Sequence, residues 1–233
     1  MNLQIPFPRA TLGSLCGLCG LLVLGLVVAR RPAIAFEPTL ANLPLSINLT
    51  IEIYELPREK FHELTQQQPG LRNDDVLLKK IRGLVADKEA KLTEHHSLNT
   101  RSGQRASMAS GSEIIFGTEF NEETAMPTAF EMRKAGFSAK VDPVIGPDSF
   151  TVDLNLAVEI CEFLGMEKTR YTNPKTKKSC IVEQPRFYSR KLTTAITSYD
   201  GMPRLMGNFG AKGDPTGKTG IIGVVFVTPT LVN

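Results

Sequence analysis

Histidine and cysteine, which most often bind metals or act as nucleophiles, are scarce in this sequence. Its 233 residues include three histidines, four cysteines and no tryptophan. His95 and His96 are adjacent, so on a strand they would face opposite sides and could not bind one metal ion together. Cys16 and Cys19 lie inside an apolar stretch, which favours apolar filler over a redox pair. The sequence therefore predicts no catalytic residues, no metal site and no cofactor.

A surplus of positive charge is also missing once the N-terminus is set aside. The whole chain has a formal net charge of +3, but residues 1–35 contain three arginines and no acidic residue. The remainder is therefore balanced, whereas proteins that bind nucleic acid usually carry a basic surface that neutralises phosphates. We expect no nucleic-acid partner.

A complete phosphate-binding loop is lacking as well. Gly217-Lys218-Thr219 matches the end of the P-loop pattern, but that pattern needs a glycine at the position of Lys212. It also needs a following helix, whereas Ile221–Val227 is β-branched and favours a strand. We interpret residues 210–220 as a flexible turn and predict that the protein is not an enzyme.

The N-terminus has the features of an export signal. An apolar run from Leu12 to Val28 follows a positively charged start, and Ala33-Ile34-Ala35 resembles a signal-peptidase site. We predict a signal peptide over residues 1–35, cleaved after Ala35. Arg30 and Arg31 follow the apolar run, where positive charge opposes export, so an uncleaved N-terminal anchor is the alternative.

An extended lead-in over residues 36–45 is expected to precede one domain over 46–233. The domain begins with a strand over Ser46–Leu56, in which aliphatic and polar residues alternate. Two short helices are expected next, over residues 58–68 and from Asn73 or Asp74, either of which can cap the second helix. The buried face of the first strand is expected to hold Ile47, Leu49, Ile51 and Ile53.

The rest of the chain favours antiparallel strands joined by turns, which makes the fold class α+β and mainly antiparallel β. A turn at residues 101–103 is expected to join two short strands, and a turn at 146–148 to join two longer ones. Residues 165–179 are interpreted as a polar loop. A strand over 188–199 is expected to end at an Asp-Gly turn, residues 200–201.

The cysteines beyond residue 35 are Cys161 and Cys180. They flank the predicted polar loop, and in an oxidising compartment two such residues can pair if their Cβ atoms come close enough. We therefore predict a disulfide between them in the exported protein.

Several motifs resemble those of a known family. Arg190, Thr193 and Thr197 precede the turn Asp200-Gly201, and a final hydrophobic strand carries Thr228-Pro229. This ending resembles the secretin pore domain, the outer-membrane channel of type II and type III secretion systems and type IV pili. Further positions that resemble the family are Gly136, Val141, Pro143, Asp148 and Leu154, and the Thr, Gly and Ala positions of its gate within Thr100–Ala106.

The order of elements over residues 46–233 also resembles the family: one strand, two helices, gate hairpins, then paired long strands. Residues 202–208 depart from it, because Pro203 is expected to remove a hydrogen bond from the strand after the Asp-Gly turn. The resemblance implies a homo-oligomeric ring or β-barrel channel for protein secretion. It also implies a place in the outer membrane or periplasm and partners among the secretion machinery. The alternative is a soluble periplasmic scaffolding module that kept the fold and lost the pore.

The residues themselves suggest which strand mediates assembly. The segment 220–233 is too apolar to be left exposed, and no second sheet is expected to cover the long strands of a single copy. We expect Ile221–Val227 to be an edge strand, and closing a sheet between copies would remove such edges, as a barrel in lipid requires. The predicted assembly residues on this strand are Val224, Phe226, Thr228, Pro229 and Leu231.

Overall fold

A computed structural model describes residues 46–66, 74–121, 124, 126–172, 176–177 and 179–232. The predicted signal peptide or anchor and the predicted lead-in lie outside the described residues. The elements are β1 (Ser46–Pro57), α1 (Arg58–Gln66), α2 (Asp75–Ala86), β2 (Lys91–Arg101), β3 (Ala106–Phe120), β4 (Pro127–Ile145), β5 (Thr151–Thr172), β6 (Ser179–Tyr199), β7 (Arg204–Gly210) and β8 (Ile221–Val232).

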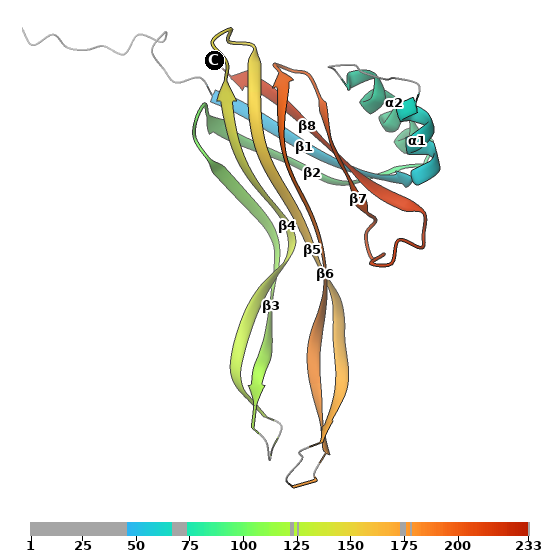
Figure 1. The fold of residues 1–233 in the computed structure, drawn as a ribbon, viewed down its shortest axis with the longest axis vertical. Helices are drawn as coiled ribbons and strands as arrows, with labels where there is room; N and C mark the ends of the chain where they lie inside the picture. The colour runs from blue at the N-terminus through green and yellow to red at the C-terminus, as the bar shows by residue number, and fades with distance from the viewer. Residues whose placement is uncertain are drawn as a thin grey trace, which may run out of the picture. The chain divides into compact units, whose positions relative to one another are not determined.

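The strands form two four-stranded antiparallel sheets (Figure 1). Sheet A has the order β2-β1-β8-β7, and sheet B has the order β3-β4-β5-β6. The predicted class, α+β and mainly antiparallel with two short helices near the start, is confirmed. Because sheet A joins β1 to β8, its two central strands come from the two ends of the described chain.

One core lies between the two sheets. Ile47, Leu49, Ile51 and Ile53 of β1 are fully buried, which confirms the face predicted from their alternation. They pack against alternating aliphatic residues of β5, including Leu154. The expectation that a single copy has no second sheet to cover its strands is therefore wrong. Burying one such side chain stabilises the fold by roughly 1.5–3 kcal/mol.

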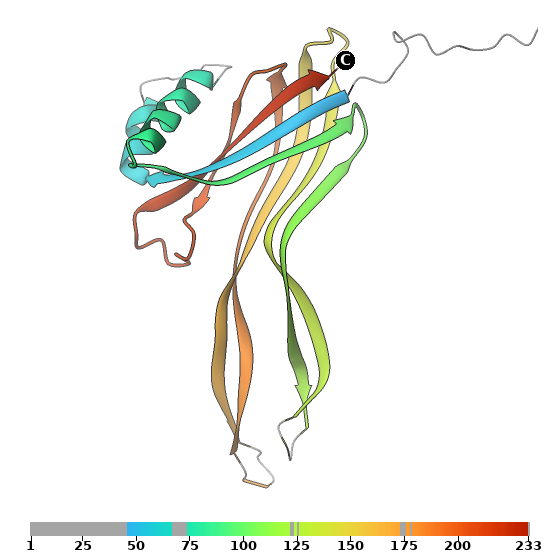
Figure 2. The same cartoon turned by 180° about the vertical axis from the view of Figure 1, so that it is seen from behind.

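A second core lies between sheet A and the helices, which cover the other face of that sheet (Figure 2). Leu77, Leu78 and Ile81 of α2 pack there. The buried Glu52 carboxylate accepts hydrogen bonds of 2.9 Å from the Arg82 guanidinium and from the Tyr54 hydroxyl. Burial raises the pKa of that hydroxyl. This paired charge fixes α2 to β1 without leaving a buried carboxylate unsatisfied.

Two connections differ from the predicted ones. The turn at 101–103 does not join a hairpin, because β2 pairs with β1 and β3 pairs with β4. The turn instead carries the chain from sheet A to sheet B. Residues 165–179 do not form a loop, since β5 continues to Thr172 and β6 begins at Ser179. The turn predicted at 146–148 does join β4 to β5.

Candidate assembly surfaces

Each sheet ends in two strands whose outer edges are unpaired within the described residues. In sheet B these are β3 and β6, with 15 and 21 residues, and in sheet A they are β2 and β7. An unpaired edge presents a row of backbone N–H and C=O groups that another chain can bind. None of these four edges was predicted from the sequence, because edge position depends on pairing between distant segments.

Sheet B divides into two ribbons beyond Gly136 and Cys161, the last pair that joins β4 to β5. We call these ribbons arm 1 (residues 112–120 and 127–135) and arm 2 (residues 163–172 and 179–189). Figures 1 and 2 show the two arms diverging below the two-sheet part. Gly136 has φ of 145°, and a Cβ there would lie 2.2 Å from the backbone oxygen of Ser110. Glycine is therefore required where β4 leaves β5.

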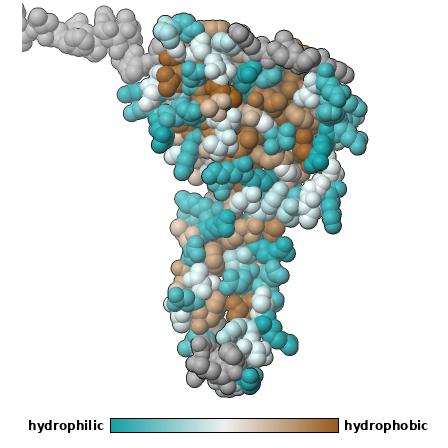
Figure 3. Space-filling model, in the orientation of Figure 1, coloured by the Kyte–Doolittle hydropathy of each residue, from teal (hydrophilic) through white to brown (hydrophobic). Residues whose placement is uncertain are grey.

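Arm 1 carries large apolar side chains in contact with solvent. Ile115, Phe130 and Met132 are 67%, 64% and 51% exposed. Ile115 is paired with Met132, and Phe130 with Gly117, so all three lie on one face of the ribbon. On arm 2, Met166 and Ile181 are also exposed. Figure 3 shows apolar side chains among hydrophilic ones along the arms. Exposed groups of this kind mark interaction sites.

The opposite face of arm 1 contacts arm 2. The guanidinium carbon of Arg133 lies 4.6 Å from the centre of the Phe187 ring, and the same guanidinium donates a hydrogen bond of 3.2 Å to Ser189. The rings of Phe116 and Phe163 lie 6.1 and 5.8 Å from that of Phe187. This contact holds the two arms of one copy together beyond the point where β4 and β5 separate.

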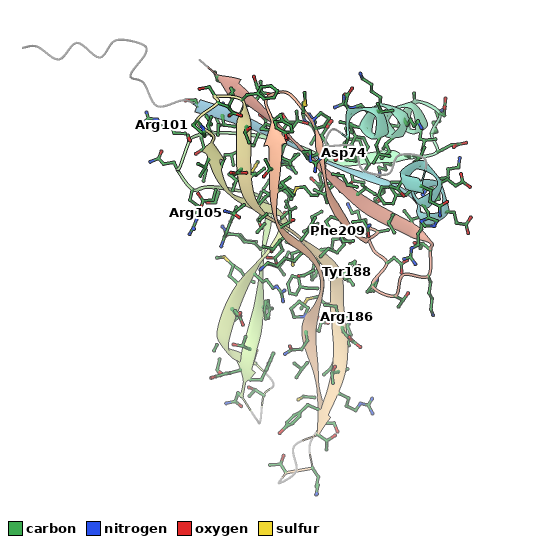
Figure 4. All side chains as sticks on the ribbon, turned by 45° about the horizontal axis from the view of Figure 1, so that its top comes forward. Asp74, Arg101, Arg105, Arg186, Tyr188 and Phe209 are labelled. Atoms are coloured by element: carbon green, nitrogen blue, oxygen red, sulfur yellow. The ribbon has the colours of Figure 1, made fainter. Side chains whose placement is uncertain are left out.

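The outer edge of β7 is partly covered by the start of α2. The backbone N–H of Asp74 donates to the carbonyl of Pro203, and the Asp74 carboxylate accepts a hydrogen bond of 2.7 Å from the N–H of Leu205. Figure 4 labels Asp74 beside this strand. Asp74 does precede α2, but its side chain caps the sheet edge and not the helix. Pro203 precedes β7, so the hydrogen bond that it was expected to remove is not lost.

The predicted assembly strand, β8, is not an edge. It is paired with β1 along its whole length and with β7 from Ile222 to Val227. Val224 and Phe226 are fully buried and pack against the helices, while Leu231 packs on the inter-sheet core. Val224 and Phe226 therefore stabilise the fold of a single copy. The prediction that β8 is an edge strand is wrong, because β8 pairs with β1, about 180 residues earlier in the chain.

Thr228 and Pro229 lie beyond the end of the β7 pairing. Pro229 is opposite Leu49 of β1, and its carbonyl accepts a hydrogen bond from Gly201 on the other side. The predicted turn Asp200-Gly201 is therefore present, and it contacts the last strand directly. A role of Thr228, Pro229 and Leu231 in assembly stays a prediction.

A buried ion cluster joins the two sheets. Arg190 of β6 is 6% exposed and forms ion pairs with Glu55 of β1 and Glu162 of β5. The two carboxylates also accept hydrogen bonds from the backbone N–H groups of Lys212 and Gly213. Figure 4 labels Tyr188 and Phe209, whose rings lie 5.8 and 5.2 Å from the Arg190 guanidinium. The cluster thus fixes the β7–β8 connection to the sheets.

The two glutamates of this cluster were missed, although the sequence held a signal for them. Glu55 follows the alternating inward series of β1, and Glu162 follows the inward series of β5 that ends at Ile160. A charged residue at a position where alternation predicts an apolar one indicates a buried partner. Arg190 was noted only as part of a family resemblance.

Residues 211–220 form successive turns, as predicted, and the Asp214 side chain binds several of them. The Asp214 carboxylate accepts hydrogen bonds from the backbone N–H groups of Thr216, Lys218 and Thr219, and from the hydroxyls of both threonines. These bonds hold the pKa of Asp214 far below its usual range, those from Thr219 most strongly. The N–H groups of Lys218 and Thr219 therefore bind a carboxylate of the protein itself.

The predicted disulfide is contradicted by the strand register. Cys161 is opposite Ser189, and Cys180 is opposite Tyr171, ten residues farther along β5. At about 3.3 Å per residue the two cysteines are separated by roughly 33 Å along the hairpin. A disulfide needs Cα atoms less than about 7 Å apart, and both thiols are free. The error followed from treating residues 165–179 as a loop.

The segment that resembles the family's gate, Thr100–Ala106, is the crossover between the sheets. Gly103 donates its N–H to the carbonyl of Pro143, and the Ser102 hydroxyl accepts from the N–H of Ile145. Figure 4 labels Arg101 and Arg105 on either side of this turn. Arg105 pairs with Asp142 at 3.2 Å. These contacts hold the crossover against β4.

The described residues contain no group of three or more His, Cys, Asp or Glu side chains that could hold a metal ion. His96 stacks on Phe137 with ring centres 3.9 Å apart and contacts Glu94. It therefore serves packing between β2 and sheet B. Across the same described residues, no helix has the length and apolar character needed to span a membrane.

Comparison with known proteins gives one family match. A family model described as Secretin, "Bacterial type II and III secretion system protein", matches residues 83–220. That range is more than half of the chain. A search of curated proteins found no match.

Solved structures with a similar fold include secretins from three bacteria. They are PulD in the Klebsiella pneumoniae type II secretion system outer membrane complex (11% identity, TM-score 0.45), the V. cholerae type IV competence pilus secretin PilQ (13%, 0.48) and the InvG secretin domain of the Salmonella injectisome (11%, 0.46). Each alignment covers 82% of this chain. The chain spans 41%, 61% and 64% of the respective matched chains.

Proposed function

Because the chain belongs to the secretin family of bacterial type II and III secretion system proteins, we propose that it assembles into a homo-oligomeric ring. The ring would contribute to a channel for protein secretion in the cell envelope. We further propose export by a cleaved signal peptide, a location in the outer membrane or periplasm, and partners among the other secretion proteins. The chain would act in this role as a structural component and not as an enzyme.

The observation that carries the ring is the pair of long unpaired edges of sheet B. Strand direction alternates across the four strands, so β3 and β6 run in opposite directions. Placing β6 of one copy beside β3 of the next therefore continues the antiparallel pattern. A head-to-tail contact of this kind closes into a ring when the rotation between copies divides a full turn.

Sheet A supports the same arrangement. The turn at 102–105 links β2 to β3, and the turn at 200–203 links β6 to β7. Edge strand β2 of sheet A is thus connected to edge strand β3 of sheet B, and β7 of sheet A to β6 of sheet B. Neighbouring copies would then meet through both sheets at once. Asp74 covers the start of the β7 edge, which would restrict contact there to the end of β7 nearer Gly210. Most of the interface would come from sheet B.

One observation favours the alternative, a periplasmic module that does not enter a membrane. Arm 2 has ion pairs on both faces: Lys168 with Glu183 on one, and Arg186 with Glu167 on the other. A strand wall in lipid needs one apolar face about 25 Å tall. A ring whose arms are in water on both sides satisfies this pattern and keeps the proposed assembly.

Oligomer size tests the proposal. Light scattering and electron microscopy of the full chain in mild detergent are expected to reveal a ring. Replacing Ile115 and Phe130 with serine should reduce assembly, because both side chains are exposed in one copy and would be covered in a ring. Val76→Ser is the matched control, since Val76 is 45% exposed on α2 and far in sequence from either arm.

A wild-type protein that stays monomeric at every concentration would contradict the ring. Cell fractionation distinguishes a location in the outer membrane from a location in the periplasm. Resistance to extraction by salt and alkali would support the outer membrane, whereas release into the soluble fraction would support the periplasmic module.

A further inference from the structure

The two arms carry charge of opposite sign. The strands of arm 1 hold three acidic and two basic residues, and those of arm 2 hold three basic and two acidic residues. In the sequence, residues 121–126 add two glutamates and residues 173–178 add three lysines. Neither range adds a charge of the other sign. We infer that arm 1 of one copy binds arm 2 of its neighbour by charge, an inference that rests on the proposed ring.

Most charges on the arms are already used within one copy. Glu113 of arm 1 pairs with Lys134 at 3.7 Å, and the two ion pairs of arm 2 were described above. Arg133 lies on Phe187 and donates to Ser189. The three ion pairs neutralise their own members, and Arg133 is bound by Phe187 and Ser189, so few charges are left for a neighbour to recognise.

Three arm charges remain without such a partner in the described part of the chain. Glu119 and Glu131 of arm 1 and Arg170 of arm 2 are exposed and form no ion pair within 4.0 Å. The charges left over are thus acidic on arm 1 and basic on arm 2. This is the complement that two different surfaces of one chain need in order to bind each other head to tail.

Glu119 and Arg170 also lie at about the same level of sheet B. Glu119 is opposite Ala129, seven residues beyond Gly136 on β4. Arg170 is nine residues beyond Cys161, the partner of Gly136, and one of the nine is taken up by the bulge at Phe163–Gly165. When β3 lies beside β6 of the next copy, β6 separates Glu119 from Arg170 on β5, so the two backbones lie roughly 10 Å apart. At that separation opposite charges still attract and like charges repel, and salt screens both effects.

In the resulting ring every acidic arm lies between two basic arms. One is arm 2 of the same copy, held through Arg133 and Phe187, and the other is arm 2 of the neighbour. The second copy is therefore the occupant of the free β3 edge. Because the contact repeats at each interface, a small effect per pair becomes a large effect on assembly.

Charge reversal tests this inference on the full chain. Glu119→Arg and Arg170→Glu each place like charges at the interface, and each is expected to raise the concentration needed for half-maximal assembly about 3-fold or more. The double variant restores opposite charges and should assemble like the wild type. An equimolar mixture of the two single variants should also recover assembly. Raising NaCl from about 0.05 to about 0.5 M should weaken wild-type assembly, because salt screens exposed charges.

The controls separate this inference from the ring itself. Glu63→Arg reverses a charge at an exposed site on α1, away from the arms, and should leave assembly unchanged. If the wild type assembles and neither single reversal weakens it, charge recognition is wrong and the ring stands. If the double variant stays as weak as the single variants while its circular dichroism matches the wild type, the pairing of these two residues is wrong. A wild type that is monomeric in every buffer overturns both proposals.

Discussion

The backbone N–H of Gly201 donates a hydrogen bond of 2.8 Å to the carbonyl of Pro229. Two residues on, the N–H of Leu231 donates to the Asp200 carboxylate, also at 2.8 Å. In a strand the N–H and C=O of one residue point to the same side, so the N–H that Pro229 lacks would have pointed to this turn and not to β1. The Asp-Gly turn therefore completes the edge of β8 where β7 has not yet begun.

Asp200→Ala is expected to destabilise the fold by about 1–3 kcal/mol, because it removes the charged acceptor of the Leu231 N–H. Urea unfolding followed by circular dichroism measures the change. Asp87→Ala, at an exposed site after α2, serves as the control and should change stability by less than about 0.5 kcal/mol. Equal effects of the two substitutions would argue against the capping role.

Phe226→Ala is expected to cost about 3–5 kcal/mol, because Phe226 is fully buried and packs edge-on against Tyr54 with ring centres 6.2 Å apart. Deleting residues 220–233 should abolish folding of a single copy, since it removes the strand between β1 and β7. Thermal unfolding measures the first change, and protease sensitivity the second. A truncated chain that still folds would contradict the central place of β8.

Arg190→Met is expected to destabilise the protein by about 3–5 kcal/mol, because it leaves Glu55 and Glu162 as buried carboxylates without a cation. Hydrogen exchange should increase at Lys212 and Gly213, whose N–H groups bind those carboxylates. Adding Glu55→Gln and Glu162→Gln to this variant should recover part of the stability. Unchanged exchange at the two residues would show that the cluster does not hold the connection.

Asp214→Asn should lower the melting temperature at neutral pH, because the carboxylate binds three backbone N–H groups and two hydroxyls. The pKa of Asp214 is lower in the folded protein than its usual 3.8, so the ionised form favours folding. The difference between wild type and variant should thus be complete above pH 4 or so and shrink as the pH falls below it. Lys218→Ala, which would disable a P-loop, should change neither stability nor assembly.

The predicted cleavage after Ala35 is tested by the intact mass of the exported protein. The expected mass corresponds to a chain that begins at Phe36. A mass that retains residues 1–35 would indicate the anchor, with Arg30 and Arg31 at the membrane surface.

The parts of the fold that depend on neighbouring residues could be predicted from the sequence. Local patterns predicted four of its features. These are the inward face of β1, the two helices near the start of the domain, the turn between β4 and β5, and the Asp200-Gly201 turn. The second helix begins at Asp75, just after its predicted start, because helix ends depend on contacts as well as on sequence. For the same reason, the Asp74 side chain is found on β7 and not on its own helix.

Pairing between distant segments could not be predicted, and the errors follow from it. β8 was taken for an edge because nothing local indicates that Ile51 lies opposite Val227. The polar residues 165–172 were taken for a loop because an arm exposed on both faces lacks the alternation that marks a half-buried strand. The Arg190 cluster was missed as a unit because Glu55 and Arg190 are 135 residues apart.

The pairing of β1 with β8 also constrains how the domain forms. Ser46 lies opposite Val232, so the first strand of the described residues pairs with the last one. Until β8 has been made, β1 lacks the strand between it and β7, and the second core lacks Val224 and Phe226. Contacts at such a separation form late and slowly. The domain over β1–β8 therefore stays open until β8 has been made, which is the state that the proposed export would need.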